Sequence, residues 1–236
     1  MTAPWPLHNL EGKGPAALIV RHAERHPVRS IHDSLAIGLT EKGKEDAVRF
    51  GESIAGPTEV RLYHSPAVRC RETAMGIAEG LRSNGLRVIG TEERRSLCAP
   101  YLKDERVLID ADRLGHAFMR AWFEGRFDPR WLLPTPEAAD MVLSPMISGL
   151  DSISENGLEI HVSHDWEIVL LREELLGVRY EDAGWVEYLD GLALTRAGSV
   201  YSASCPHGQG RFAFLEGRRQ GADRRPGGSI GPPAGP

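Results

Sequence analysis

Short apolar runs alternate with longer segments of helical periodicity along most of this chain. The helical spacing of apolar residues predicts helices at 40–55, 65–85 and 166–177. The apolar runs predict strands at 16–20, 59–64, 86–90, 158–163, 192–196, 199–205 and 211–216. Strands and helices that alternate through short loops predict an α/β fold, namely a three-layer α/β/α sandwich with a mainly parallel central sheet.

The stretch from 91 to 157 interrupts this alternation. Apolar spacing predicts helices near 112–125 and 136–150, and we expect this stretch to form a small helical cap over one edge of the sheet. With this cap, residues 1–217 are expected to form one domain. Residues 218–236 are mostly Gly, Pro and Arg, which cannot bury an apolar core, so we expect a disordered C-terminal tail. The sequence leaves open whether the tail belongs to the natural protein.

Composition narrows the class of protein. A formal net charge of −5 argues against a general nucleic-acid or membrane-surface binder. The three cysteines show neither CxxC spacing nor a disulfide framework, which favours a reducing compartment. The N-terminal residues do not resemble a signal peptide, and no apolar stretch approaches the roughly 20 residues that span a bilayer. We therefore expect a cytoplasmic protein, of an oligomeric state that the sequence does not indicate.

Charged and polar residues gather where three predicted strands end. The carboxyl ends of parallel strands share one edge of a sheet, so these loops are expected to meet. Several arginines around one point select a phosphate group, because the guanidinium fork matches its oxygens, and a helix N-cap at Ser65 would add its dipole. A phosphate or sulfate ion is expected to bind there. The residues are Arg21, His22, Arg69, His164 and Asp165.

The histidines and the carboxylate suggest a reaction. A neutral imidazole beside a bound phosphoryl group can attack phosphorus and form a phosphohistidine. A second imidazole, if protonated, would stabilise charge on the phosphoryl oxygens. Asp165 could protonate the leaving alkoxide, provided that its surroundings raise its pKa.

Four segments resemble motifs of the histidine phosphatase superfamily, whose fold is that of the phosphoglycerate mutases. They are RHAERHP, GLTEKGKEDAVRFG, YHSPAVRCRETA and VSHD, in the family's order. The first and last resemble the histidine acid phosphatase branch (branch 2) more closely. The resemblance implies His22 as the nucleophile and Asp165 as the proton donor. It also implies a phosphate pocket formed by Arg21, Arg25, Arg69 and His164.

The chain departs from that branch in two ways. Ala23 stands where the motif has glycine, and the chain is too short for the large helical domain of the acid phosphatases. In the mutase-like relatives (branch 1), the donor is a glutamate after the third strand. Glu92 and Glu93 lie near that place, so the donor is either Asp165 or one of these glutamates.

The predicted function is hydrolysis of a small phosphorylated metabolite through a phosphohistidine, with no cofactor and no metal. A phosphomutase of the same superfamily and a non-catalytic phospho-ligand module are the alternatives. A histidine-ligated metallohydrolase is disfavoured, because the arginines would repel a cation. The substrate stays open, since the basic and aromatic residues of the predicted cap suit a sugar phosphate, a nucleotide or a phosphopeptide.

Overall fold

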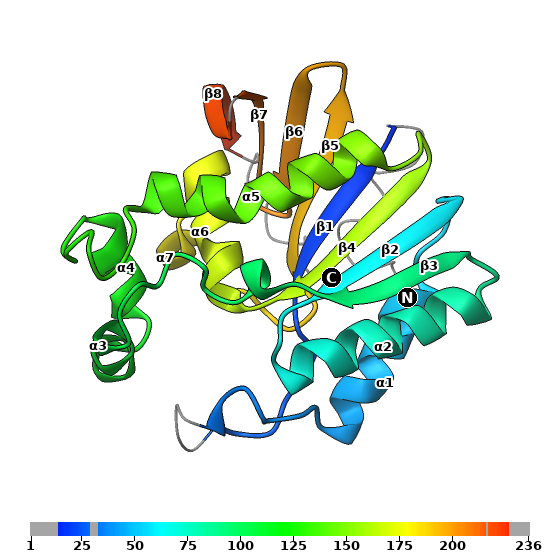
Figure 1. Cartoon of the computed structure of the whole chain (residues 1–236), viewed down its shortest axis with the longest axis horizontal. Coiled ribbons are helices and arrows are strands. Elements are labelled where there is room, and N and C mark those ends of the chain that lie inside the picture. The colour runs from blue at the N-terminus through cyan, green and yellow to red at the C-terminus, as the bar shows by residue number, and fades with distance from the viewer. Residues whose placement is uncertain (1–13, 29–32, 216, 227–236) are drawn as a thin grey trace, which may run out of the picture.

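The computed structural model describes residues 14–28, 33–215 and 217–226. An eight-stranded sheet forms the centre of this part, with the order β3-β2-β4-β1-β5-β6-β7-β8 (Figure 1). The predicted strands are all present, and the third is displaced by two to three residues toward the C-terminus. The strands are β1 (Ala16–Arg21), β2 (Glu59–His64), β3 (Val88–Glu93), β4 (Gly157–Ser163), β5 (Gly191–Ala197), β6 (Val200–Cys205), β7 (Gly208–Leu215) and β8 (Arg218–Pro226).

The sheet has a parallel half and an antiparallel half. Strands β3, β2, β4 and β1 are parallel, whereas every pairing from β1–β5 to β7–β8 is antiparallel. The α/β sandwich is confirmed, but the expectation of a mainly parallel sheet is corrected. Only two residues separate β5 from β6, one of them Gly198 at φ 62°. Such a tight connection forms a hairpin and cannot bring the chain back to a parallel strand.

Helices cover both faces of the sheet because alternate strand residues point to opposite sides. Leu18 and Val20 of β1 pack in the core under α1 (Glu41–Glu52) and α2 (Val68–Ser83). Ala17 and Ile19 pack in the other core, under α5 (Thr135–Ser152) and α6 (Asp165–Leu176). Figure 1 shows α5 crossing β1 and β4 on that second face.

Close contact between α1 and α2 depends on glycine. A Cβ atom at Gly80 would lie 2.1 Å from the carbonyl oxygen of Val48, and one at Gly51 would lie 2.2 Å from that of Ile77. Both distances are far below van der Waals contact, so a side chain at either position would push the helices apart. The spacing of these helices matters because α2 carries Arg69.

Helix α2 begins later than predicted. Its N-cap is Ala67 rather than Ser65, and no side chain caps it. The Ser65 hydroxyl instead contacts His164, as described below. Helix α6 begins at Asp165 and ends at Gly177 in the left-handed conformation, φ 66°, in agreement with the predicted helix end.

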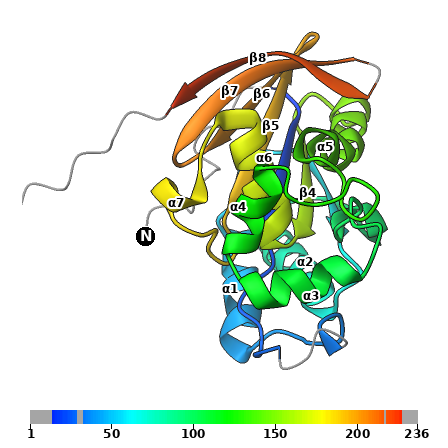
Figure 2. The same ribbon diagram turned by 90° about the vertical axis from the view of Figure 1, so that its left-hand side faces the viewer.

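The cap between β3 and β4 is shorter than the predicted 91–157. Helix α5 packs against β1 and β4 and is part of a sheet-covering layer. The cap, defined here as residues 94–134, contains η3 (Arg95–Leu97), α3 (Arg106–Leu114) and α4 (Ala117–Phe123). Phe118 and Trp122 anchor α4 in the core beside Tyr101. Figure 2 shows α3 and α4 in front, with α7 (Tyr180–Ala183) beside α4.

The C-terminal region differs from the expected disordered tail over part of its length. Residues 218–226 form β8, which pairs with β7. An antiparallel ladder bonds backbone groups, so it tolerates a composition that cannot form a core. The remaining positions of the predicted tail, 227–236, lie outside the described residues. None of the helices in the described ranges has the length and hydrophobicity needed to cross a membrane.

Candidate active site

The loops after β1, β2 and β4 meet at one edge of the sheet, as the parallel order requires. Arg21 lies opposite Ser163 in the β1–β4 register. The ladder continues past the strand ends, because the His22 N–H donates to the Ser163 carbonyl at 3.0 Å. The Ser65 N–H donates to the Val162 carbonyl at the same distance. Backbone hydrogen bonds therefore hold the three loops together.

His22 is buried, with 3% of its surface exposed. Its Nδ1–H donates to the Ala23 carbonyl at 2.8 Å, so Nε2 keeps its lone pair. The pKa of His22 is lowered to about 3, chiefly by burial and in part by the charges of Arg69 and Arg21, which together outweigh the opposing hydrogen bond to Ala23. The imidazole is therefore neutral near pH 7, in the tautomer that leaves Nε2 free for attack.

Thr73 fixes the backbone beside His22. Its hydroxyl accepts a hydrogen bond from the Ala23 N–H at 3.0 Å and donates to the Arg69 carbonyl at 2.7 Å. Thr73 is fully buried. One hydroxyl thus joins the loop that carries His22 to the helix that carries Arg69.

His164 lies beside His22, with ring centroids 5.6 Å apart and an edge-to-face angle of 70°. Arg69 Nη2 donates to His164 Nδ1 at 3.0 Å, and His164 Nε2–H donates to the Ser65 hydroxyl at 2.8 Å. Burial, followed by the charges of Arg69 and His22, holds the pKa of His164 well below its ordinary value. The protonated second imidazole considered from the sequence is absent in this arrangement, and Arg69 supplies the positive charge.

Arg21 and Asp165 form an ion pair, with Arg21 Nη2 3.2 Å from Asp165 Oδ2. Arg21 Nη1 also donates to the Val186 carbonyl at 2.6 Å, and its guanidinium lies 4.3 Å from the centroid of the Tyr188 ring. The Trp185 indole N–H donates to Asp165 Oδ2 at 3.1 Å. The segment before β5 therefore contacts both partners of the pair.

The other predicted site residues lie around this centre. Arg25 donates to the His26 carbonyl at 2.9 Å, and its charge is among the arginine charges that lower the pKa of His164 after burial. Glu92 and Glu93 are exposed at the end of β3, where Glu93 lies opposite His64 in the register. Arg21, His22, Arg69, His164 and Asp165 thus meet, and Arg25 and the two glutamates lie at the periphery.

Thr73, Trp185 and Tyr188 are site residues that sequence reasoning missed. A threonine hydroxyl inside a helix gives no signal of its own. The aromatic residues in GWVEYLDG, between a helix and a strand, were a signal. In a mainly parallel sheet, however, the segment before a strand lies at the edge opposite the carboxyl ends, away from the expected site. Because β5 is antiparallel to β1, its amino end lies beside the carboxyl end of β1, where Gly191 pairs with Val20.

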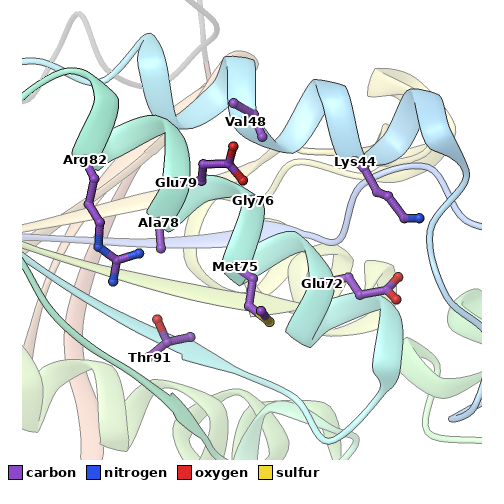
Figure 3. A pocket seen from close by; sticks show the side chains of 9 residues that line it. All are labelled: Lys44, Val48, Glu72, Met75, Gly76, Ala78, Glu79, Arg82 and Thr91. Atoms are coloured by element: carbon purple, nitrogen blue, oxygen red, sulfur yellow. The ribbon is translucent and has the colours of Figure 1, made fainter.

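The open groove in Figure 3 is a different part of the surface. It has a volume of about 670 Å³ and crosses α2 between α1 and β3. Its charged side chains are two cations and two carboxylates, which give no net preference for an anion. None of the residues described above as meeting at the sheet edge lines it. The lining residues are Lys44, Val48, Glu72, Met75, Gly76, Ala78, Glu79, Arg82 and Thr91.

Solved structures with the same fold include a mycobacterial glucosyl-3-phosphoglycerate phosphatase. It has 19% sequence identity and a TM-score of 0.51, covering 76% of this chain and 89% of that chain. YhfR of Bacillus stearothermophilus has 18% identity and a TM-score of 0.50, and the match covers 87% of this chain and 94% of YhfR. A protein described as mycobacterial hydrolase 2 has 20% identity and a TM-score of 0.52, and the match covers 78% of this chain and 83% of that protein. At these identities the likeness establishes the fold.

Sequence comparison identifies the family. A search of curated proteins finds no match. A family model described as histidine phosphatase superfamily (branch 1) matches residues 17–197, which include the three loops of the site and β5. The match is to branch 1, and the closer resemblance to the acid phosphatase branch is not confirmed. With more than half of its length matched, the chain belongs to the histidine phosphatase superfamily.

Proposed function

We propose that this protein hydrolyses phosphomonoesters through a phosphohistidine formed on His22. The state of His22 carries the proposal: a buried, neutral imidazole with Nδ1–H bound to a carbonyl and Nε2 unprotonated. Such a ring is a nucleophile for phosphorus. The cations around it, Arg21 and Arg69, match the charge and geometry of a phosphoryl group.

The first step transfers the phosphoryl group to the protein. Nε2 of His22 attacks phosphorus, and the bond between phosphorus and the ester oxygen breaks. Asp165 gives its proton to that oxygen, so the leaving group departs as an alcohol. Arg69 and Arg21 stabilise the negative charge on the phosphoryl oxygens. His164, which accepts from Arg69 and donates to Ser65, helps to orient the Arg69 guanidinium.

The second step releases phosphate. A water molecule attacks the phosphorus of phosphohistidine, and the Asp165 carboxylate takes the proton that this water loses. The bond between phosphorus and Nε2 breaks, which restores the neutral imidazole and leaves Asp165 protonated for the next cycle. This sequence consumes one water and yields one alcohol and one phosphate.

Asp165 is the proposed donor because of its position: it is the first residue of α6, next to His164, and its carboxylate lies within the site, 3.2 Å from Arg21. Glu92 and Glu93 are the competing donors, and the branch 1 match favours a glutamate after the third strand. The variants D165N, E92Q and E93Q separate the two assignments. Loss of the general acid should slow esters of alcohols far more than esters of acidic phenols, whose leaving groups depart unprotonated.

The substrate we propose is a small phosphorylated metabolite. Three basic residues of the cap region already pair with carboxylates: Arg113 with Asp110, Arg120 with Glu173 and Glu181, and Arg126 with Glu124. These arginines are therefore poor candidates for binding a second anion. The name of one structural neighbour, glucosyl-3-phosphoglycerate phosphatase, agrees with a phosphorylated metabolite as the substrate class.

The decisive experiment combines a phosphatase screen with trapping of the intermediate. The protein is assayed against a library of phosphorylated metabolites, and the best substrate, labelled with radioactive phosphate, is used for an alkaline quench. We expect an acid-labile phosphoenzyme and release of inorganic phosphate, both abolished in H22A. H207A is the matched control, because His207 is exposed in the turn between β6 and β7.

Each outcome separates the candidates. Label retained on H22A would overturn the proposal. Transfer of the label to a second metabolite without phosphate release would identify a phosphomutase. Phosphate binding without any turnover would identify a non-catalytic module.

A further inference from the structure

The segment 185–188, just before β5, contacts the site without carrying one of its charged groups. Val186 accepts a hydrogen bond from Arg21 through its carbonyl, and Tyr188 presents its ring to the same guanidinium. Trp185 donates its indole N–H to Asp165 Oδ2. Each contact is made by a neutral group.

The carboxylate of Asp165 is held at both oxygens. Oδ2 accepts from Trp185 and faces Arg21, and Oδ1 accepts from the Trp166 N–H at 3.1 Å. The side chain is nevertheless 27% exposed. Without Trp185, the carboxylate would keep Arg21 and the Trp166 N–H, but Oδ2 would lose its indole donor. The indole N–H therefore limits the directions that this partly exposed carboxylate can take.

The cap holds Trp185 in turn. The His116 ring stacks on the indole, with centroids 3.9 Å apart and planes within 7°. The Tyr180 ring meets the indole edge-on at 5.2 Å, and the Tyr180 hydroxyl donates to the His116 carbonyl at 3.0 Å. His116 is the N-cap residue of α4. A continuous set of contacts therefore runs from the cap through His116 and Trp185 to Asp165.

Two ion pairs fix this set of contacts. Arg120 of α4 bonds the Glu181 carboxylate of α7 at 2.5 Å and the Glu173 carboxylate of α6 at 2.8 Å. The arginine thereby fastens α4 to the helix that carries Asp165 and to the one that carries Tyr180. The stack has little freedom to slide.

We infer that Trp185 is a positioning residue for Asp165, and that the cap acts on proton transfer through the stack of His116 on Trp185. This inference rests on the proposed function, in which Asp165 protonates the leaving group. It assigns to the cap a role in the chemical step, separate from any role in substrate selection. Misplacement of the Asp165 carboxyl should then slow phosphoryl transfer from an alkyl ester, whose leaving group needs a proton. It should spare transfer from an ester of an acidic phenol, whose leaving group departs unprotonated.

The test compares an alkyl phosphate with p-nitrophenyl phosphate in the full-length protein. W185F keeps an aromatic ring for the stack and loses the N–H. We expect kcat/KM for the alkyl ester to fall roughly 5- to 10-fold, the loss of one hydrogen bond, while kcat/KM for p-nitrophenyl phosphate changes less than about 2-fold. The comparison uses kcat/KM because this ratio reports phosphoryl transfer to His22 and not the later hydrolysis, in which Asp165 acts as a base with either substrate. H116A should produce the same selective loss, since it removes the stack and leaves the N–H.

A matched control and a double variant complete the design. W131F alters a cap tryptophan that contacts Arg106, and it should leave the ratio of the two kcat/KM values unchanged. D165N should lower the alkyl rate further than W185F, and D165N/W185F should be no slower than D165N, because the indole acts only through the carboxylate.

Two results would overturn the inference: an equal loss on both substrates in W185F, or full additivity in the double variant. If D165N itself leaves the ratio unchanged, Asp165 is not the donor, and the inference fails with that assignment. The phosphohistidine on His22 would be unaffected by that result, because the labelling of H22A tests it separately.

Discussion

The two halves of the sheet contribute different kinds of residue to the same site. The parallel strands β1, β2 and β4 lead to His22, to Arg69 in the first turn of α2, and to His164. His22 and His164 lie side by side, and Arg69 bonds His164 and carries the positive charge. The antiparallel strand β5 is preceded by Trp185 and Tyr188, which are neutral and contact the charged residues from outside. The charged groups of the site therefore come from the parallel half, and the antiparallel half adds neutral supporting contacts.

This difference has a physical reason. The arginines near the ends of the parallel strands converge on one site, so they repel one another, and neutral groups fix their directions. A carbonyl, a ring face and an indole N–H do this without adding a net charge that would compete with phosphate. Removal of a charged member should therefore cost catalysis most, and removal of a support should cost less.

Among substitutions that leave His22 in place, the largest expected effect is that of R69Q. Arg69 contacts His164 and supplies positive charge next to His22, so its loss should lower kcat/KM about 10²- to 10³-fold, the scale found for removal of one transition-state donor. Steady-state kinetics on the best substrate from the screen measures it. R71Q, an exposed arginine two residues along the same helix, is the control. Comparable losses in both variants would contradict the assignment.

The next effect concerns Glu167, a buried residue of α6 that holds the start of the cap. One of its oxygens accepts from the Ala99 N–H at 2.6 Å and the Tyr101 hydroxyl at 3.3 Å. Ala99 has a positive φ of 42°, so this contact supports a strained turn. Burial raises the pKa of Glu167 from 4.5 to about 7.

The sign of the pH dependence follows from that pKa. The folded protein keeps the Glu167 proton up to about pH 7, whereas the unfolded chain loses it near 4.5. The stabilising contribution is complete below pH 4.5 and is lost as the pH rises through 7, by up to about 3 kcal/mol. E167Q, which stays neutral, should remove this decline. Urea unfolding at pH 5 and pH 8 measures the free energy of unfolding of the parent protein and of E167Q. An equal decrease between the two pH values in both proteins would refute the prediction.

The smallest effect tests the supporting half directly. Y188L removes the ring beneath Arg21 and should lower kcat/KM roughly 3- to 10-fold, the range of a partly desolvated cation–π contact. Y188F keeps the ring and should remain near the parent value. A loss as large as that of R69Q would place Tyr188 among the residues that act on the substrate and would end the distinction between the two halves.

The loops of the parallel half were predictable because their signals are local. Arg21 and His22 follow an apolar run, and His164 and Asp165 follow another, so strand ends and polar residues could be paired by position alone. The hydroxyl of Ser65 shows the limit of this reasoning. Its place after a strand and before proline is typical of a helix N-cap, but the hydroxyl bonds His164, 99 positions away.

The sequence alone determined that strands alternate with helices and which polar residues follow the first, second and fourth strands, because periodicity and strand ends are properties of neighbouring residues. Only the tertiary structure decided that β5 runs antiparallel to β1, that α5 belongs to a sheet layer, and that Trp185 reaches Asp165. The edge of β1 can bond a strand of either direction, and it pairs parallel with β4 and antiparallel with β5, so the residues of β5 do not fix its direction. Contacts between distant segments have no local signal.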